Sequence, residues 1–226
     1  MAELKAVIFD MDGVIIDSEP IYFEIERSLF DKLGVDISQK EHESFVGMTM
    51  EGLWEKITDQ YQLEDTIEDL TRLHKDSVFQ YMSEAKELPI VKYIKELIEE
   101  LRNRKIKLAL ASSSPKKLIE IILAKLNLQD SFDLIISGEE VEKGKPAPDI
   151  FTEAAYRLDL NPNDCIVIED STNGVKAAKA AMMKCIGFQN INSGNQDLSL
   201  ADITVDSIGE IAVSYTHLTL PTKRIV

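Results

Sequence analysis

Short, unbroken apolar runs recur through the chain and limit the folds open to it. They occur at residues 6–9, 108–111, 134–136, 166–168, 185–188 and 203–205. Because apolar and polar residues do not alternate within them, these runs are typical of strands buried on both faces, as in a parallel sheet. A chain of 226 residues with 44% hydrophobic residues is long enough to enclose such a sheet in a full core.

Helical patterns lie between most of these runs. Apolar residues spaced by three and four positions predict one helix around residues 94–101 and another around residues 118–126. We expect Ser114 to be the N-cap of the second helix, with Pro115 at its first position. Strands that alternate with helices predict an α/β fold built on a doubly wound, Rossmann-like parallel sheet.

The segment between the first two strands is far longer than a simple crossover requires, and it contains helical patterns but no strand pattern. Pro20 and Gly34 mark the ends of its first helix, and Ser38 followed by Glu41 has the spacing of a capping box. We therefore predict an inserted all-α helical cap that serves as a lid; a helical insertion that only extends the core is the alternative. The predicted division is an α/β core at residues 1–17 and 88–213, with the cap at residues 18–87.

Residues 214–226 show neither helical nor strand periodicity. This segment resembles the translation of sequencing-adapter read-through. We interpret it as a non-native tail and exclude it from the predictions.

Charge and composition exclude several classes of partner and chemistry. With 25 Lys plus Arg against 40 Asp plus Glu, the net charge of −15 disfavours binding to nucleic acid. The short apolar runs and the lack of a signal-like N-terminus predict no membrane association and a cytoplasmic location, and a monomer is the default. Cys165 and Cys185 lie in apolar runs, so we expect buried, reduced thiols. The three histidines lack the spacing of zinc ligands, and no serine lies in a nucleophile elbow.

Two acidic pairs follow predicted strands. Asp10 and Asp12 come directly after the first strand, and Glu169 and Asp170 come at the end of the fourth. Because the carboxyl ends of parallel strands meet at one edge of a sheet, we expect the two pairs to face each other. Facing carboxylates repel unless a cation lies between them, and oxygen ligands suit Mg²⁺. The sequence therefore predicts a magnesium site at Asp10, Asp12, Glu169 and Asp170.

Groups suited to an anion accompany the acidic pairs. Ser112 and Ser113 end the second strand and lead into a helix N-terminus, which favours an anion. Lys145 lies in a loop whose prolines restrict the backbone and could direct the lysine inward. An anion that binds a lysine and a magnesium ion is most simply a phosphoryl group, which an aspartate can attack. Each motif alone also occurs in ordinary turns; their joint occurrence in this order favours one phosphate-binding site at Ser112, Ser113 and Lys145.

In these motifs the chain resembles the haloacid-dehalogenase superfamily, in the branch of β-phosphoglucomutase and sugar-phosphate phosphatases, over residues 5–213. The resemblance implies that Asp10 is the nucleophile and Asp12 the general acid and base. It implies that Mg²⁺ binds the Asp10 carboxylate, the Asp12 backbone carbonyl and Asp170, with Glu169 as a direct or water-mediated ligand. It also implies a cap that closes on hinges near residues 17–19 and 88–89.

The resemblance predicts a magnesium-dependent phosphatase that acts on a small phosphorylated metabolite, such as a sugar phosphate, through an aspartyl-phosphate. The alternative is a phosphosugar mutase of the β-phosphoglucomutase type. Ser18, Tyr22 and Met50 stand where such mutases typically carry Thr, His and an Arg for the second phosphate, which favours the phosphatase. Substitutes for that arginine could come from a cap helix, at Arg72, His74 or Lys75.

Three further classes fit the sequence less well. Asp12 argues against a dehalogenase, which needs no general acid at that position. A signalling receiver domain places its acidic residues and its phosphorylated aspartate in a different order and lacks an inserted cap. An inactive relative is disfavoured because Asp10, Asp12, Lys145 and Asp170 are all present.

Overall fold

The computed structural model describes residues 4–46 and 48–211. The predicted tail at residues 214–226, His217 included, lies outside the described residues, as do residues 212 and 213 of the predicted core.

Within the described residues, six strands form one parallel sheet. They are β1 (Ala6–Phe9), β2 (Lys107–Ser112), β3 (Leu134–Ser137), β4 (Cys165–Glu169), β5 (Lys184–Phe188) and β6 (Ile203–Val205). Their order is β3-β2-β1-β4-β5-β6, so β1 lies between β2 and β4. The chain places β2 and β3 on one side of β1 and then β4, β5 and β6 on the other, so the strand order reverses at β1. In such sheets, ligands bind at the carboxyl ends of the strands beside this reversal.

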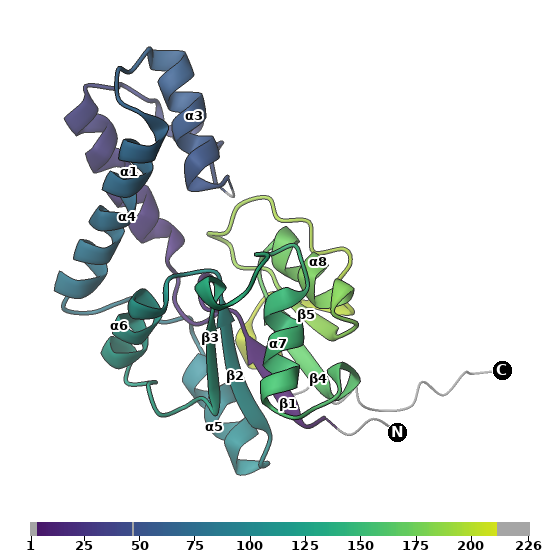
Figure 1. The fold of residues 1–226 in the computed structure, drawn as a ribbon. Helices are drawn as coiled ribbons and strands as arrows, with labels where there is room; N and C mark the ends of the chain where they lie inside the picture. The colour runs from purple at the N-terminus through teal and green to yellow at the C-terminus, as the bar shows by residue number, and fades with distance from the viewer. Residues whose placement is uncertain (1–3, 47, 212–226) are drawn as a thin grey trace.

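Helices cover both faces of the sheet, because successive residues of each buried strand point to opposite sides. Val7 and Phe9 share an apolar cluster with α5 (Ile94–Asn103) and α6 (Lys116–Leu126). Ala6 and Ile8 belong to a second cluster with α7 (Asp149–Arg157) and α8 (Thr172–Ala180). Figure 1 shows the two helical layers on either side of the strands. The predicted doubly wound α/β core is confirmed. In the part of the chain that the structure describes, short 3₁₀ helices also belong to it: η1 (Gly138–Glu140), η2 (Pro162–Asp164) and η3 (Ile208–Glu210).

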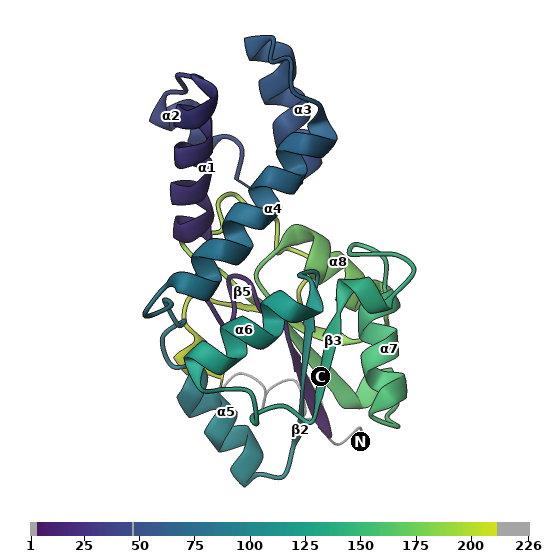
Figure 2. The ribbon, with the colours of Figure 1, turned by 60° about the vertical axis from the view of Figure 1, so that its left-hand side comes forward.

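The part of the chain between β1 and α5 forms the predicted all-α cap. Its helices are α1 (Glu19–Leu33), α2 (Gln39–Glu43), α3 (Met50–Tyr61) and α4 (Ile67–Glu84). The first ends at Gly34, whose φ of 69° is left-handed, and Ser38 caps the second by accepting a hydrogen bond from the Glu41 amide at 3.3 Å. An aromatic contact between Phe30 and Trp54 links α1 to α3, with ring centroids 5.8 Å apart. Figures 1 and 2 show α1, α3 and α4 standing together beyond one end of the sheet.

The two chain crossings between core and cap lie side by side. The Asp17 amide donates to the Pro89 carbonyl at 2.9 Å, and the Val91 amide donates to the Ile15 carbonyl at 2.9 Å. The predicted domain boundaries and hinges fall in this paired segment, and they stay predictions.

The predicted cap of α6 is wrong. The helix begins at Lys116, Pro115 occupies the N-cap position, and no side chain caps the first turn. The Ser114 hydroxyl instead donates to the Asp12 Oδ2 atom at 2.9 Å. A long-range polar partner has therefore displaced the local cap.

Both cysteines are buried free thiols, as expected. Burial and the nearby Asp164 carboxylate raise the pKa of Cys165 to about 11, which keeps its thiol protonated. Among the helices of the described residues, none combines the length and the apolar character needed to cross a membrane.

Candidate active site

The predicted acidic pairs meet at the carboxyl ends of β1 and β4. Asp10 follows β1, and its amide donates to the Ile168 carbonyl of β4 at 3.0 Å. Glu169 ends β4 and Asp170 follows it. One carboxylate oxygen from each of Asp10, Glu169 and Asp170 lies within 4.8 Å of the others, and all three side chains are buried. The sheet order brings these groups together because β1 and β4 are direct neighbours.

Lys145 connects the two strands at this edge. Its ammonium Nζ donates to Asp10 Oδ1 at 2.7 Å, to Glu169 Oε1 at 2.6 Å and to the Ala111 carbonyl of β2 at 3.2 Å. Only 7% of its side chain is exposed. The peptide bond between Lys145 and Pro146 is cis. Burial disfavours the ammonium ion, but the carboxylates of Asp10 and Glu169 raise the pKa of Lys145 above its ordinary value, so it stays charged.

The buried carboxylates outnumber the cation that faces them. Burial and the nearby Glu169 and Asp12 carboxylates raise the pKa of Asp10 to about 7, although Lys145 opposes this rise. Burial, Glu169 and Asp10 likewise raise the pKa of Asp170 well above its usual range. These raised pKa values reflect the unfavourable electrostatic energy of several carboxylates close together in a desolvated site. A hard divalent cation bound by the oxygens of Asp10, Glu169 and Asp170 would remove that cost.

Gly13 leaves room for this cluster. A Cβ atom at this position would lie 1.9 Å from Asp170 Oδ2, and the residue has a φ of 76°. Both the close approach and the left-handed backbone require glycine here. The loop after β1 is therefore shaped around the Asp170 carboxylate.

Asp12 lies beside the cluster, with its carboxylate held separately. Its Oδ1 atom accepts a hydrogen bond from the Tyr22 hydroxyl at 2.8 Å, and its Oδ2 atom accepts one from the Ser114 hydroxyl at 2.9 Å. Burial and the Asp12 carboxylate raise the pKa of Tyr22 well above its ordinary value, so the phenol remains a donor. Tyr22 comes from the cap helix α1 and Ser114 from the core, so both parts of the fold orient Asp12.

A cavity of about 500 Å³ opens over these carboxylates. The core lines it with Asp10, Asp12, Gly13, Ser113, Gly144, Lys145, Asp170, Ser171, Asn173, Ser193 and Gln196, and the cap lines it with Glu19, Met48 and Thr49. Ser113 thus reaches the cavity. Ser112 is fully buried and is not among the described residues that line the cavity, and its hydroxyl accepts a hydrogen bond from the Ser114 amide at 3.0 Å.

The loop that follows β5 supplies partners that were absent from the predictions. The Ser193 hydroxyl donates to Asp170 Oδ2. The Asn190 side-chain amide donates to the Gly13 carbonyl at 2.9 Å. The only sequence signal for these contacts was the polar composition of residues 189–197 directly after a buried strand. The predicted site residues Asp10, Lys145, Glu169 and Asp170 are thus in direct contact or in one cluster, with Asp12 and Ser113 beside the same cavity.

Comparison with known proteins gives consistent matches. The sequence model of the family described as haloacid dehalogenase-like hydrolase matches residues 7–188. A phosphorylated carbohydrates phosphatase of Thermotoga maritima is 36% identical over 180 residues, which are 79% of this chain and 82% of the relative. The β-phosphoglucomutase of Bacillus subtilis is 32% identical over 223 residues, which are 95% of this chain and 94% of the relative.

A similar solved structure is CbbY from Rhodobacter sphaeroides in complex with phosphate. It superimposes with a TM-score of 0.76 at 27% identity, covering 92% of this chain and 96% of CbbY. The matched region includes the inserted helices as well as the sheet that carries the clustered carboxylates.

Proposed function

The chain belongs to the haloacid dehalogenase-like hydrolase family and is a phosphoric monoester hydrolase; we propose that it is a magnesium-dependent phosphatase of small sugar phosphates. One observation carries the proposal: Lys145 binds both Asp10 and Glu169 in the cavity where β1 and β4 end. The arrangement combines a nucleophile, a fixed cation and an oxygen cluster suited to a hard metal ion.

In the proposed reaction, a carboxylate oxygen of Asp10 attacks phosphorus as the bond from phosphorus to the leaving oxygen breaks. Asp12 gives its proton to that leaving oxygen. Asp12 then takes a proton from a water molecule, which attacks the aspartyl-phosphate, releases inorganic phosphate and restores Asp10. Lys145 and Ser113 hold the phosphoryl oxygens during both steps, with Ser112 beneath them.

The residues present fit Mg²⁺. The carboxylates of Asp10, Glu169 and Asp170, with the backbone carbonyl of Asp12, would hold it. When bound, the ion offsets negative charge on Asp10 and on the transferring phosphoryl group. We also propose that residues 18–87 act as a lid that excludes water, since Glu19, Met48 and Thr49 of the cap line the cavity.

The mutase is the second candidate, because the Bacillus subtilis β-phosphoglucomutase matches nearly the whole chain. A mutase needs a side chain that binds the second phosphate, and two of the possible substitutes for the missing arginine make contacts that disfavour this role. Arg72 is exposed and pairs with Asp69, and Lys75 is exposed and lies 3.6 Å from Glu51. These contacts support hydrolysis over transfer to a second position of the sugar. A monomer is proposed because the cap completes the cavity from the same chain. A cytoplasmic location is also proposed, and it rests on the sequence alone.

The test is phosphate release from a panel of hexose, pentose and polyol phosphates, with Mg²⁺ and with EDTA. We expect magnesium-dependent release from at least one sugar phosphate. A coupled assay for glucose 6-phosphate formed from β-glucose 1-phosphate checks the mutase. Formation of glucose 6-phosphate without net phosphate release would contradict the phosphatase.

The contact between Tyr22 and Asp12 gives a separate prediction. We expect Tyr22→Phe to lower kcat by about tenfold, because the hydrogen bond that orients Asp12 is lost while the ring still packs. KM should change by less than about twofold, since the phenol orients Asp12 rather than the substrate. Steady-state kinetics on the best substrate of the panel measures both constants. An unchanged kcat would show that Ser114 alone positions Asp12.

A further inference from the structure

A second, smaller hollow lies in the cap and adjoins the catalytic cavity. It has a volume of about 180 Å³ and is lined by Glu19, Tyr22, Phe23, Glu26, Val46, Met48, Thr49, Met50, Leu53 and His74. Glu19, Met48 and Thr49 line both spaces. A phosphate ester held over Asp10 would therefore direct its leaving group past Glu19 into the cap hollow.

His74 in this hollow has unused hydrogen-bonding capacity. Its side chain is 1% exposed, and neither ring nitrogen has a hydrogen-bond partner among the described residues. The nearby Glu26 carboxylate lies 3.8 Å from the Nε2 atom and is already bound to His42 at 2.6 Å. Burial lowers the pKa of His74, so the ring is neutral and offers one donor and one acceptor. Buried polar atoms of this kind are normally satisfied, and a ligand hydroxyl would satisfy them here.

Among the described residues, the charged side chains that line the hollow are acidic. Glu19 and Glu26 line it, and neither lysine nor arginine does so among the described residues. In the adjoining cavity, the described lining residues include one such cation, Lys145, which already binds Asp10 and Glu169. A second phosphate group in the hollow would meet carboxylates without a compensating cation. A neutral hydroxyl could instead donate to Glu19 and bond to His74.

We propose that Glu19 is a specificity-determining residue, which, with His74, selects monophosphates with an uncharged, hydroxyl-bearing leaving group and rejects bisphosphates. This inference rests on the proposed phosphatase function and narrows its substrate class. Glu19 accepts a hydroxyl hydrogen bond at the junction of the two spaces, and His74 binds a second hydroxyl deeper in the cap.

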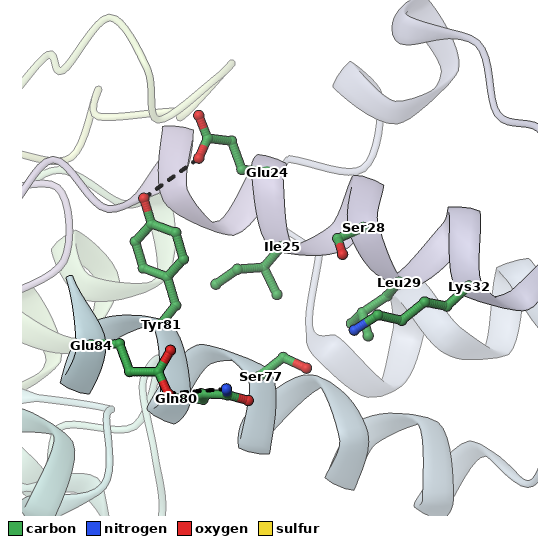
Figure 3. Close-up of a pocket in the computed structure, with 9 residues that line it drawn as sticks. All are labelled: Glu24, Ile25, Ser28, Leu29, Lys32, Ser77, Gln80, Tyr81 and Glu84. Atoms are coloured by element: carbon green, nitrogen blue, oxygen red, sulfur yellow. Dashed lines mark hydrogen bonds between the residues drawn. The ribbon is translucent and has the colours of Figure 1, made fainter.

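The cap also offers a matched control on the same helix. A separate groove of about 350 Å³ lies between α1 and α4, and Figure 3 shows Glu24 and Tyr81 facing each other across it. The Tyr81 hydroxyl donates to Glu24 Oε2 at 3.5 Å. Among the described residues, no side chain lines both this groove and either of the two spaces above. Glu24→Gln therefore makes the same chemical change as Glu19→Gln without touching the proposed subsite.

The experiment measures competition against hydrolysis of p-nitrophenyl phosphate at pH 8, using glucose 6-phosphate and glucose 1,6-bisphosphate as competitors. Wild type should bind the monophosphate at least about tenfold more tightly than the bisphosphate. Glu19→Gln should reduce that ratio of inhibition constants about tenfold, because the repelling charge is gone. Glu24→Gln should leave the ratio within about twofold of wild type. An unchanged ratio in Glu19→Gln would overturn the proposal.

His74→Phe tests the inner contact and keeps the ring volume. Its inhibition constant for glucose 6-phosphate should rise about tenfold through the lost hydrogen bonds. The inhibition constant for inorganic phosphate, which has no leaving group to enter the hollow, should stay within about twofold. An unchanged inhibition constant for glucose 6-phosphate would show that His74 does not bind the substrate. If wild type hydrolyses no p-nitrophenyl phosphate and no sugar phosphate, the proposed function fails; if hydrolysis is present but the ratios do not move, only the specificity proposal fails.

Discussion

Asp10→Asn should abolish phosphate release, lowering kcat/KM by roughly four orders of magnitude or more. The carboxamide carries no negative charge and is a poor nucleophile, so the first displacement cannot proceed. Its oxygen can still accept the hydrogen bond that Lys145 now gives to Asp10 Oδ1. We therefore expect a folded but inactive protein, and phosphate release with Mg²⁺ present is the measurement. Asp65→Asn, an exposed change in the turn between α3 and α4, is the matched control.

The same variant should change how stability depends on pH in EDTA. The pKa of Asp10 is raised from 3.8 to about 7 in the folded protein, so the folded state holds this proton more tightly than the unfolded chain. Its contribution to stability is fully present below about pH 4 and is lost as the pH rises to about 7. The free energy of unfolding of wild type should fall over this window, and Asp10→Asn should fall less. Full magnesium-dependent turnover by Asp10→Asn would show that Asp10 is not the nucleophile.

Lys145→Met is expected to be the most destabilising of the site variants. It removes the ammonium that binds Asp10 and Glu169 and leaves two buried carboxylates without it. Breaking a buried ion pair in this way costs about 3–5 kcal/mol, measured as the loss of unfolding free energy in urea. Loss of the cation should also lower kcat by about a thousandfold. Added Mg²⁺ should recover part of the stability but not the activity.

Lys143→Met is the control for this prediction, because Lys143 is an exposed lysine in the same loop. It should alter the unfolding free energy by less than about 0.5 kcal/mol and leave kcat unchanged. Equal losses in both variants would mean that the loop, and not the buried ammonium, is responsible.

The secondary structure was largely readable from local patterns. The run at residues 6–9 matches β1, and the run at residues 203–205 matches β6, while the other four strands extend their runs by one or two residues. Strands buried on both faces need unbroken apolar residues, and this requirement is visible in sequence. The exception was Ser114, where a local rule predicted a helix cap and a distant carboxylate took the hydroxyl instead.

Most of the site residues that could be predicted are attached directly to strand ends, and Lys145, predicted from the prolines of its loop, is the exception. Asp10, Glu169 and Asp170 follow from the parallel sheet, because its strands end at one edge. The side chains that hydrogen-bond to the site carboxylates were harder to predict from the sequence. Ser193 binds Asp170 from a loop with no distinctive motif, and Tyr22 reaches Asp12 only because α1 lies over the core edge.

The sequence by itself determined the α/β class, the inserted helical segment and the chemical types of the groups at the strand ends, because periodicity and strand-end position are local properties. The tertiary structure alone decided which of these groups touch. Lys145 meets Asp10 across 135 residues of chain, and Ser114 meets Asp12 across 102. The cap hollow around Glu19 and His74 likewise exists only after α1, α3 and α4 have packed. Such contacts depend on strand order and helix packing, which bring together side chains that no sequence spacing relates.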